Sequence, residues 1–267
     1  MVRGLYINGW SMLAHNRKMD VIANNLANAD TNGYKKETAC LGSFPEVMVR
    51  RIYDTPSRLN PSARVGLVEL SADISQNFVF FNPGPSEWTE RSLDIAIDDN
   101  EGEDNASRAR SFFTIDYLNT QTGERQTRYT RDGAFIIDNN GTLCTVIGDT
   151  VMGENGAITL EGDDFTVTTD GLVIQNDVVI DRLRITSFED PHTLRKVGDN
   201  LFITTDESVE RPFDGVLRQC YLEHSSVNTV QEMVDMITVM RAYEANQKMV
   251  HAIDGTLEKA CNEVGRV

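Results

Sequence analysis

The chain has few cysteines, no long apolar run and no leader-like start, and each shortage argues against a class of protein. Cys40, Cys144, Cys220 and Cys261 stand far apart without a C-x-x-C pair, which argues against a zinc site and against a disulfide-dense scaffold. We expect buried free thiols instead. No stretch approaches 18 consecutive apolar residues, so no membrane-spanning helix is predicted. The first 18 residues lack both an uninterrupted apolar core and a small-residue cleavage site, so no secretory signal is predicted.

Basic charge is scarce, and its distribution is uneven. The formal net charge is −16. Residues 71–225 carry 12 basic and 29 acidic side chains, whereas residues 1–70 carry 9 and 6, and residues 226–267 carry 4 and 6. An acidic middle repels nucleic acid and anionic lipid. We therefore expect no nucleic-acid partner, while the near-neutral ends can pack against copies of themselves.

Residue patterns for catalysis are missing. The sequence has no G-x-S-x-G motif, no Walker A loop and no dinucleotide-binding glycine fingerprint. His251, Asp254 and Glu258 share one helix face, but a solvated or intersubunit face is favoured there over a metal site. The acidic run at residues 98–104 lacks the glycine and the spaced glutamate of an EF-hand loop, so a solvated loop is predicted. We expect a protein that is not an enzyme and that holds no cofactor and no metal.

The N-terminus has the periodicity of an amphipathic helix. Leu5, Met12, Met19 and Leu26 recur every seven residues, which is the spacing of an apolar seam. The helix should end within residues 30–33, because "DTNG" supplies turn formers and a glycine that can adopt positive φ.

The C-terminus predicts a longer helix. Ser225, Ser226 or Asn228 can cap its start, and a helix over residues 228–262 would be about 50 Å long. Patterned helices of this length usually form coiled coils or interhelical bundles. The apolar positions at three-and-four spacing are Val230, Met233, Val234, Ile237, Met240, Tyr243, Val250, Ile253 and Leu257.

The middle of the chain predicts strands. Short β-branched and aromatic runs alternate with "RDG", "NNG", "ENG", "GDD" and "TDG", a pattern typical of antiparallel hairpins. We therefore predict an α+β multidomain fold in which long N- and C-terminal α-helices form a coiled-coil or bundle domain, with an all-β domain inserted between them. The predicted boundaries are 1–36 with 226–267 for the helical assembly domain, 37–80 for an extended connector and 81–225 for the all-β domain.

Three segments resemble the flagellar axial proteins, the rod and hook group. "MDVIANNLANADTNGYKK" closely resembles their N-terminal signature and "LEHSSVNTVQEMVDMITVMRAYEANQKMVHAIDGTLEK" their C-terminal one. "YTRDGAFIIDNNGTL" is similar to a hairpin of the rod members' β domain. Two positions depart from the family pattern, since His224 stands where glycine is usual and Ser226 where asparagine is usual. These departures put a local contact in doubt.

The resemblance implies a structural subunit of the bacterial flagellar basal-body rod. Such a subunit would leave the cytoplasm through the flagellar type III export apparatus, without a cleaved signal peptide. It would then polymerise through its terminal helices into a helical tube with copies of itself and other axial proteins.

Four asparagines of the N-terminal signature fall on the family's pattern, and their amides can fix register between copies without adding charge. The alternative is that they cap and fray the helix end. The predicted assembly interface is Leu5, Met12, Met19, Ile22, Asn24, Asn25, Leu26, Asn28, Asn32, Gly33, Val230, Met233, Val234, Ile237, Met240, Tyr243, Asn246, Val250, Ile253 and Leu257.

Other functions stay open at this stage. The segment "VMGENGAITL" favours a proximal rod member, and a distal rod or hook-type member is the alternative. In a different class, the chain could be a protein whose β domain acts on the cell wall or binds a partner. A separate hydrolase domain would be needed for cell-wall cleavage, and the sequence has no room for one outside the β region.

Overall fold

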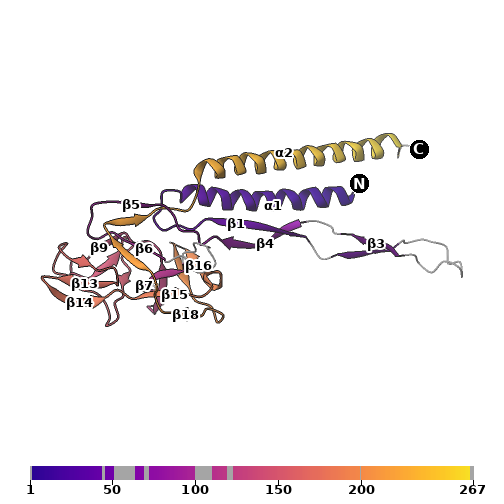
Figure 1. Cartoon of the computed structure of the whole chain (residues 1–267). Helices are drawn as coiled ribbons and strands as arrows, with labels where there is room; N and C mark the ends of the chain where they lie inside the picture. Colours follow the sequence, from indigo (N-terminus) through magenta and orange to yellow (C-terminus); the bar gives the residue numbers. More distant parts are fainter. Residues whose placement is uncertain are drawn as a thin grey trace. The chain divides into compact units, whose positions relative to one another are not determined.

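A computed structural model describes residues 2–43, 46–50, 64–68, 72–99, 110–118, 123–198 and 200–264. The chain forms two compact units (Figure 1). Unit 1 contains residues 1–26, 37–78 and 229–267, and unit 2 contains residues 27–36 and 79–228. The turn after the N-terminal helix therefore belongs to unit 2, although the helix itself belongs to unit 1.

Unit 1 combines two helices with two-stranded ribbons. The first ribbon pairs β1 with β4, and the second pairs β2 antiparallel with β3. No helix in the described part of the chain is long and apolar enough to cross a bilayer. The elements are α1 (Val2–Ala27), β1 (Glu37–Ser43), β2 (Val47–Arg50), β3 (Arg64–Val68), β4 (Ala72–Val79), α2 (Thr229–Lys259) and the π-helical end η2 (Ala260–Val264).

The prediction that long terminal helices form a coiled-coil or bundle domain is wrong. The structure has one long C-terminal helix, a shorter N-terminal helix and a mostly β middle, and the described helices do not form a coiled coil. A coiled coil requires the seam residues of each helix to be buried against the other. On α2 only Glu232 and Val239 are buried, whereas predicted seam residues such as Val234 and Ile237 are each 51% exposed.

Unit 2 is built from antiparallel strands. Its largest sheet has the order β16-β17-β8-β7-β11-β10-β9, and β15 joins it beside β7. A smaller sheet has the order β12-β13-β14, and two further pairs join β6 to β19 and β5 to β20. The strands are β5 (Ser86–Trp88), β6 (Ile95–Asp98), β7 (Ser111–Leu118), β8 (Arg125–Thr130), β9 (Phe135–Ile137), β10 (Leu143–Thr145), β11 (Thr150–Val151), β12 (Thr166–Val167), β13 (Leu172–Gln175), β14 (Val178–Arg182), β15 (Ile185–Phe188), β16 (Arg195–Gly198), β17 (Leu201–Ile203), β18 (Glu210–Arg211), β19 (Val216–Gln219) and β20 (Tyr221–Glu223).

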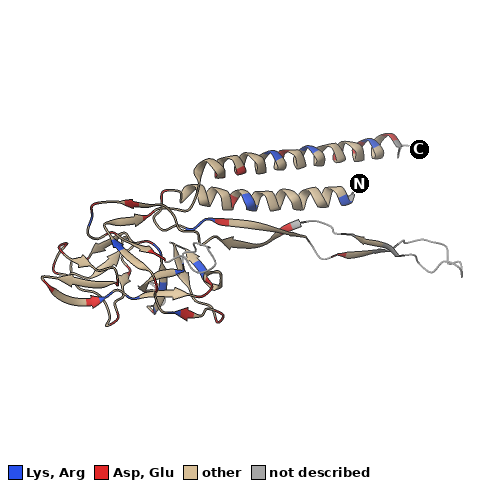
Figure 2. Ribbon diagram, viewed as in Figure 1, with Lys and Arg blue, Asp and Glu red and all other residues tan. Residues whose placement is uncertain are grey.

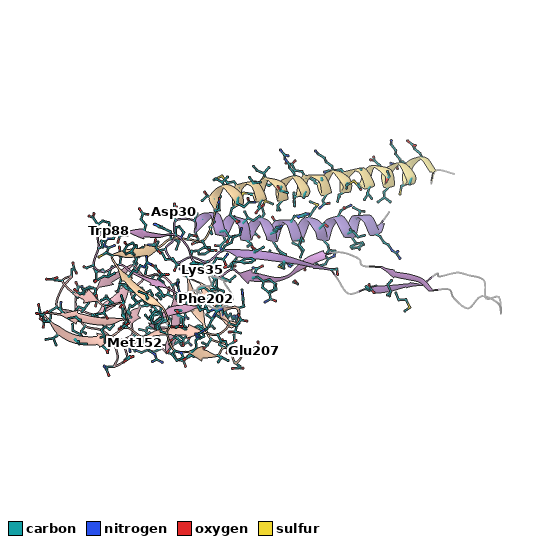
Figure 3. All side chains as sticks on the ribbon, viewed as in Figure 1. Asp30, Lys35, Trp88, Met152, Phe202 and Glu207 are labelled. Carbon is teal, nitrogen blue, oxygen red and sulfur yellow. The ribbon has the colours of Figure 1, made fainter. Side chains whose placement is uncertain are left out.

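The core of unit 2 lies on both faces of β7. Side chains of a strand alternate between its faces, so Phe112 and Phe113 enter different apolar clusters. The cluster around Phe112 includes Phe188 and Phe202, at ring centroid distances of 5.9 and 5.4 Å, and Phe202 is labelled in Figure 3. On the other face, Phe113 meets Phe135 edge to face at 5.1 Å. Two buried faces anchor the sheet whose strand β8 leads into Arg131, a member of the polar cluster described below.

Candidate assembly surface and its polar joints

An open apolar groove lies on α1. It is lined by Leu5, Tyr6, Gly9, Trp10 and Leu13 and has a volume of about 440 Å³. Tyr6 is 66% exposed and Trp10 is 41% exposed, and a Cβ atom on Gly9 would have no neighbour within 4 Å. Because helix residues four apart share a face, these side chains form one strip. Exposed tryptophan and tyrosine in such a strip are typical of protein–protein contacts.

A second apolar face lies on α2. Its residues follow the three-and-four spacing of one helix face, and exposed apolar groups arranged contiguously mark interaction sites more often than scattered ones do. Charged residues are interspersed along the ribbons of both helices (Figure 2), but this face carries a continuous apolar row. The row, named the α2 face below, consists of Val230, Met233, Val234, Ile237 and Met240, which are 46–68% exposed.

The structure distributes the predicted interface residues over three degrees of exposure. Ile22, Asn25 and Gly33 are buried. The half-buried residues are Leu5, Met12, Met19, Leu26, Asn28, Asn32, Tyr243, Asn246, Val250, Ile253 and Leu257, and the exposed ones are Asn24 and the five residues of the α2 face.

Asn25 forms a buried joint inside unit 1. Its side-chain Nδ2 donates to the Glu37 carbonyl oxygen at 2.7 Å and to Glu232 Oε2 at 3.2 Å. Its Oδ1 accepts the Glu37 backbone N–H at 3.0 Å. The amide therefore pairs with the first residue of β1 in the way that a backbone peptide would. It also contacts the first turn of α2.

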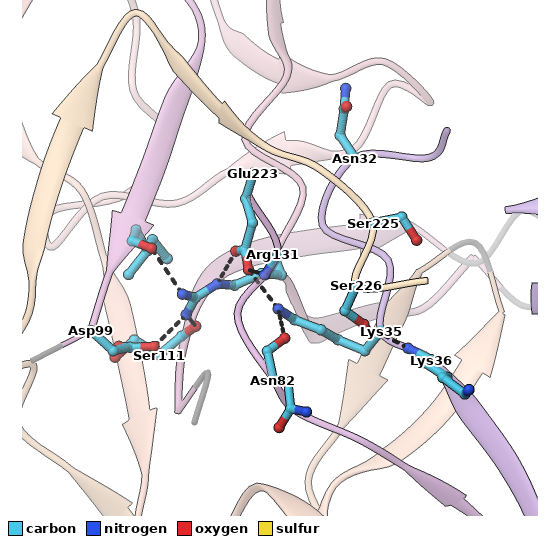
Figure 4. Close-up of polar contacts among 12 residues, drawn as sticks. Asn32, Lys35, Lys36, Asn82, Asp99, Ser111, Arg131, Glu223, Ser225 and Ser226 are labelled. Atoms are coloured by element: carbon cyan, nitrogen blue, oxygen red, sulfur yellow. Dashed lines mark hydrogen bonds and ion pairs between the residues drawn. The ribbon is translucent and has the colours of Figure 1, made fainter. Parts of the chain in front are cut away.

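A cluster of buried charges lies inside unit 2 (Figure 4). Glu223 on β20 accepts from Lys35 Nζ and from Arg131 Nε, each at 2.6 Å. Arg131 follows β8, and its Nη1 also meets Asp99 at 2.8 Å. The side chains of Lys35, Arg131 and Glu223 are at most 3% exposed, so each charge depends on its partners.

The electrostatics of this cluster follow from burial and pairing. Burial lowers the pKa of Lys35 to about 8, and the charge of Glu223 only partly opposes that shift. Burial acts to raise the pKa of Glu223, but the cations of Arg131 and Lys35 outweigh it and hold that pKa below its ordinary value. Glu223 therefore stays ionised and is the shared anion of the cluster.

Sequence reasoning missed this cluster. Lys35 lies within the N-terminal signature, Arg131 within the "RDG" turn and Glu223 within the C-terminal signature. Two turn or loop positions and the last residue of a strand, 188 residues apart at their extremes, carry no local sequence signal that predicts their contact. The one available signal was Gly33, expected to adopt positive φ, and its φ is indeed 65°.

Comparison with known proteins places these features in a family. Residues 11–35 match the family model "Flagella basal body rod protein", residues 110–175 match "Flagellar hook protein FlgE/F/G D1 domain", and residues 218–263 match "Flagellar basal body rod FlgEFG protein C-terminal". The first and last matches contain the two segments that supply Lys35 and Glu223.

Relatives match along their whole length. The chain is 32% identical to the flagellar basal-body rod protein FlgF of Caulobacter vibrioides, over 100% of this chain and 98% of the relative. It is 31% identical to the rod protein FlgG of Buchnera aphidicola subsp. Schizaphis graminum, over 97% and 98%. It is 27% identical to the flagellar hook-basal body complex protein FlhO of Bacillus subtilis, over the full length of both chains.

Terminal helices with exposed apolar faces, joined to a β unit through both signatures, define a structural protein of the bacterial flagellum. The chain belongs to the flagellar basal-body rod protein family, and it is a structural subunit of the basal-body rod. The resemblance seen in the sequence is thereby confirmed. Two of its relatives are basal-body rod proteins by name.

Proposed function

We propose that this rod subunit polymerises by burying the α2 face and the α1 groove against neighbouring copies and other axial proteins. The observation that carries the proposal is the α2 face itself, five apolar positions at three-and-four spacing of which every member is 46–68% exposed. Membership of the rod family supports the choice of occupant, because a rod is made of repeated axial subunits.

Burial of this face would contribute favourable free energy to assembly. Full burial of a Val, Ile or Met side chain stabilises by about 1.5–3 kcal/mol. Each residue of the α2 face has about half of that still to gain, so five residues supply about 5 kcal/mol per copy. The aromatic strip of the α1 groove adds to this total.

The proposal includes three further elements. The chain performs no enzymatic reaction, and the rod is the place where it functions. The flagellar type III export apparatus is its route out of the cytoplasm, without cleavage of a signal peptide. Support for these elements comes from the family, whose named members are proteins of the basal-body rod and of the hook-basal body complex.

The test substitutes one residue of the α2 face. Ile237→Asp is expected to abolish incorporation into basal bodies, because an unpaired carboxylate in an apolar contact costs several kcal/mol. The measurement is electron microscopy of basal bodies, with a motility assay, in a host whose own copy of the gene is deleted. Unit 2 should remain folded in the purified variant.

The matched control is Thr238→Asp, which adds the same charge at the next residue of α2, where the side chain is polar and does not belong to the apolar row. Thr238 is exposed, and this control is expected to assemble. Normal basal bodies with Ile237→Asp would remove the α2 face from the interface. Failure of both variants would show that charge on α2, rather than this face, decides the outcome.

A further inference from the structure

Residues 33–36, named the closing segment, lie in a slot inside unit 2. On one side the Gly33 N–H donates to the Glu223 carbonyl oxygen at 2.7 Å. The Ser226 N–H donates to the Tyr34 carbonyl oxygen at 3.0 Å, and the Lys36 N–H donates to Ser226 Oγ at 3.0 Å. Ser226, which departs from the family pattern, thus makes a specific contact. This flank is the segment that leads from β20 towards α2.

The other flank of the slot is the segment after β4. The Phe80 N–H donates to the Lys36 carbonyl oxygen at 2.8 Å. Lys35 Nζ donates to the Asn82 carbonyl oxygen at 2.8 Å. Gly33, Tyr34 and Lys35 are all buried. The closing segment is therefore held on both sides by parts of the chain that are remote from it in sequence.

The Glu223 carboxylate links the closing segment to the surrounding residues of the slot. Its Oε1 accepts from Lys35 Nζ at 2.6 Å and from the Gly84 N–H at 2.8 Å, so it joins the closing segment to the flank at residues 80–84. Its Oε2 accepts from Arg131 Nε. Figure 4 shows the Lys35 and Arg131 side chains converging on this one carboxylate. Without Lys35 and Arg131 the buried carboxylate would lack its compensating charges.

Gly33 fits the slot closely. A Cβ atom at residue 33 would lie 2.6 Å from the carbonyl carbon and oxygen of Arg131 and 2.7 Å from the Asp132 nitrogen. At φ +65° a side chain would add backbone strain. The slot therefore requires glycine next to its charged residue.

The closing segment belongs to a short stretch of unit 2 that lies, along the sequence, between two stretches of unit 1. After it, residues 37–78 belong to unit 1, and unit 2 resumes only at residue 79. Lys35 is separated from Glu223 by 188 residues, so the slot has both walls only when nearly the whole chain is present.

We propose that the closing segment is the last part of unit 2 to pack during folding, and that its contacts open together as one cooperative element. This element is named the latch. The segments that lead to α1 and to α2 are held by the same latch, so they are released together. A chain that ends before Glu223 keeps Lys35 without its carboxylate, and unit 2 of such a chain stays unlatched. The β7–β8 sheet core does not depend on the latch.

Amide hydrogen exchange on the full-length chain at pH 7 tests the latch. In Lys35→Met, the amides of Gly33, Phe80, Gly84 and Ser226 are expected to exchange about 100-fold faster, because loss of one partner from a buried ion pair is strongly destabilising. Amides that pair β7 with β8 are expected to keep their rates. Lys248→Met, the same change at an exposed residue of α2, is expected to alter none of them.

Gly33→Ala provides an independent disruption without any change of charge, and it should accelerate the same four amides. If either variant fails to fold, exchange of the unaltered chain in low denaturant replaces it. The four amides should then share one opening free energy, lower than that of the β7–β8 amides. Unchanged rates, equal loosening of β7 and β8, or four different opening free energies would each overturn the latch.

Discussion

At the scale of single residues, buried ionisable groups make the stability of unit 2 depend on pH. Lys35 has its pKa lowered to about 8 from 10.5, mainly by burial. Between these two values the unfolded chain holds a proton that the folded chain has released. Stability therefore rises with pH across this window as far as Lys35 is concerned. Glu223 has a dependence of the same sign at low pH, because its lowered pKa means that its contribution to stability is present above its unfolded pKa and is lost as the pH falls.

Asp132 supplies a prediction at this scale. Burial raises its pKa from 3.8 to about 6, while the Ala134 N–H opposes the shift and the charge of Asp94 adds to it. The folded state therefore binds the proton more tightly than the unfolded state does. The resulting stability is complete below about pH 3.8 and is lost as pH rises through 6. At neutral pH the ionised carboxylate is a cost.

Asp132→Asn should remove that cost while its amide oxygen still accepts the Ala134 N–H. We expect a gain of about 1–2 kcal/mol in the free energy of unfolding at pH 7.5, and a smaller gain at pH 5. Urea unfolding at both values measures it. Asp170→Asn, which removes an equal charge at an exposed residue, should be neutral. A variant less stable than the parent at pH 7.5 would show that the charge itself is needed.

The crowded asparagines show how far residue types alone lead. The sequence predicts polar contacts from their amides, and it cannot say with which partner. In the structure Asn25 bonds to Glu37 and Glu232 within unit 1. Asn32 contributes its backbone carbonyl oxygen, rather than its side-chain amide, to a hydrogen bond from Asn200 Nδ2 in unit 2 at 3.0 Å. An amide accepts partners in many geometries, so only the fold selects among them. Contacts of these asparagines with other copies stay a prediction.

At the scale of elements, periodicity predicted which segments are helical better than it predicted what the helices contact. The C-terminal helix was expected over residues 228–262, and α2 spans Thr229–Lys259 with η2 following. The N-terminal helix was expected to end within residues 30–33, and α1 ends at Ala27, because the turn after it is recruited into unit 2. An apolar stripe identifies a face that avoids water. The stripe does not identify the surface that covers this face, which is why the prediction of a coiled coil was wrong.

The Asn25 joint gives the prediction for these elements. Asn25→Ala would leave the Glu37 N–H and carbonyl without their side-chain partner in a buried site, which costs about 2 kcal/mol. The helical circular dichroism signal of the purified chain should therefore be lost at a lower temperature. Asn24→Ala, at the exposed neighbouring residue, should change stability by no more than about 0.5 kcal/mol. Equal effects of the two substitutions would rule out a special role for the buried amide.

At the scale of the whole molecule, the two units differ in how much apolar surface each has buried. Unit 2 contains two apolar clusters on opposite faces of β7, whereas α2 has only Glu232 and Val239 buried along its 31 residues. Isolated helices gain most of their stability from tertiary packing rather than from propensity. The helices of a single copy therefore lack the burial that would hold them rigid, and assembly would supply it.

This difference predicts two tiers of protection in a dilute, confirmed monomer. Backbone amides of residues 2–26 and 230–259 should exchange much faster than those of β7 and β8, since the opening free energy follows buried apolar contact. After polymerisation the helical amides should become protected, while those of unit 2 change little. Hydrogen exchange read by mass spectrometry, at two protein concentrations, separates the states. Strong protection of both helices in the monomer would mean that packing within one chain already stabilises them. The α2 face would then not be the main source of assembly energy.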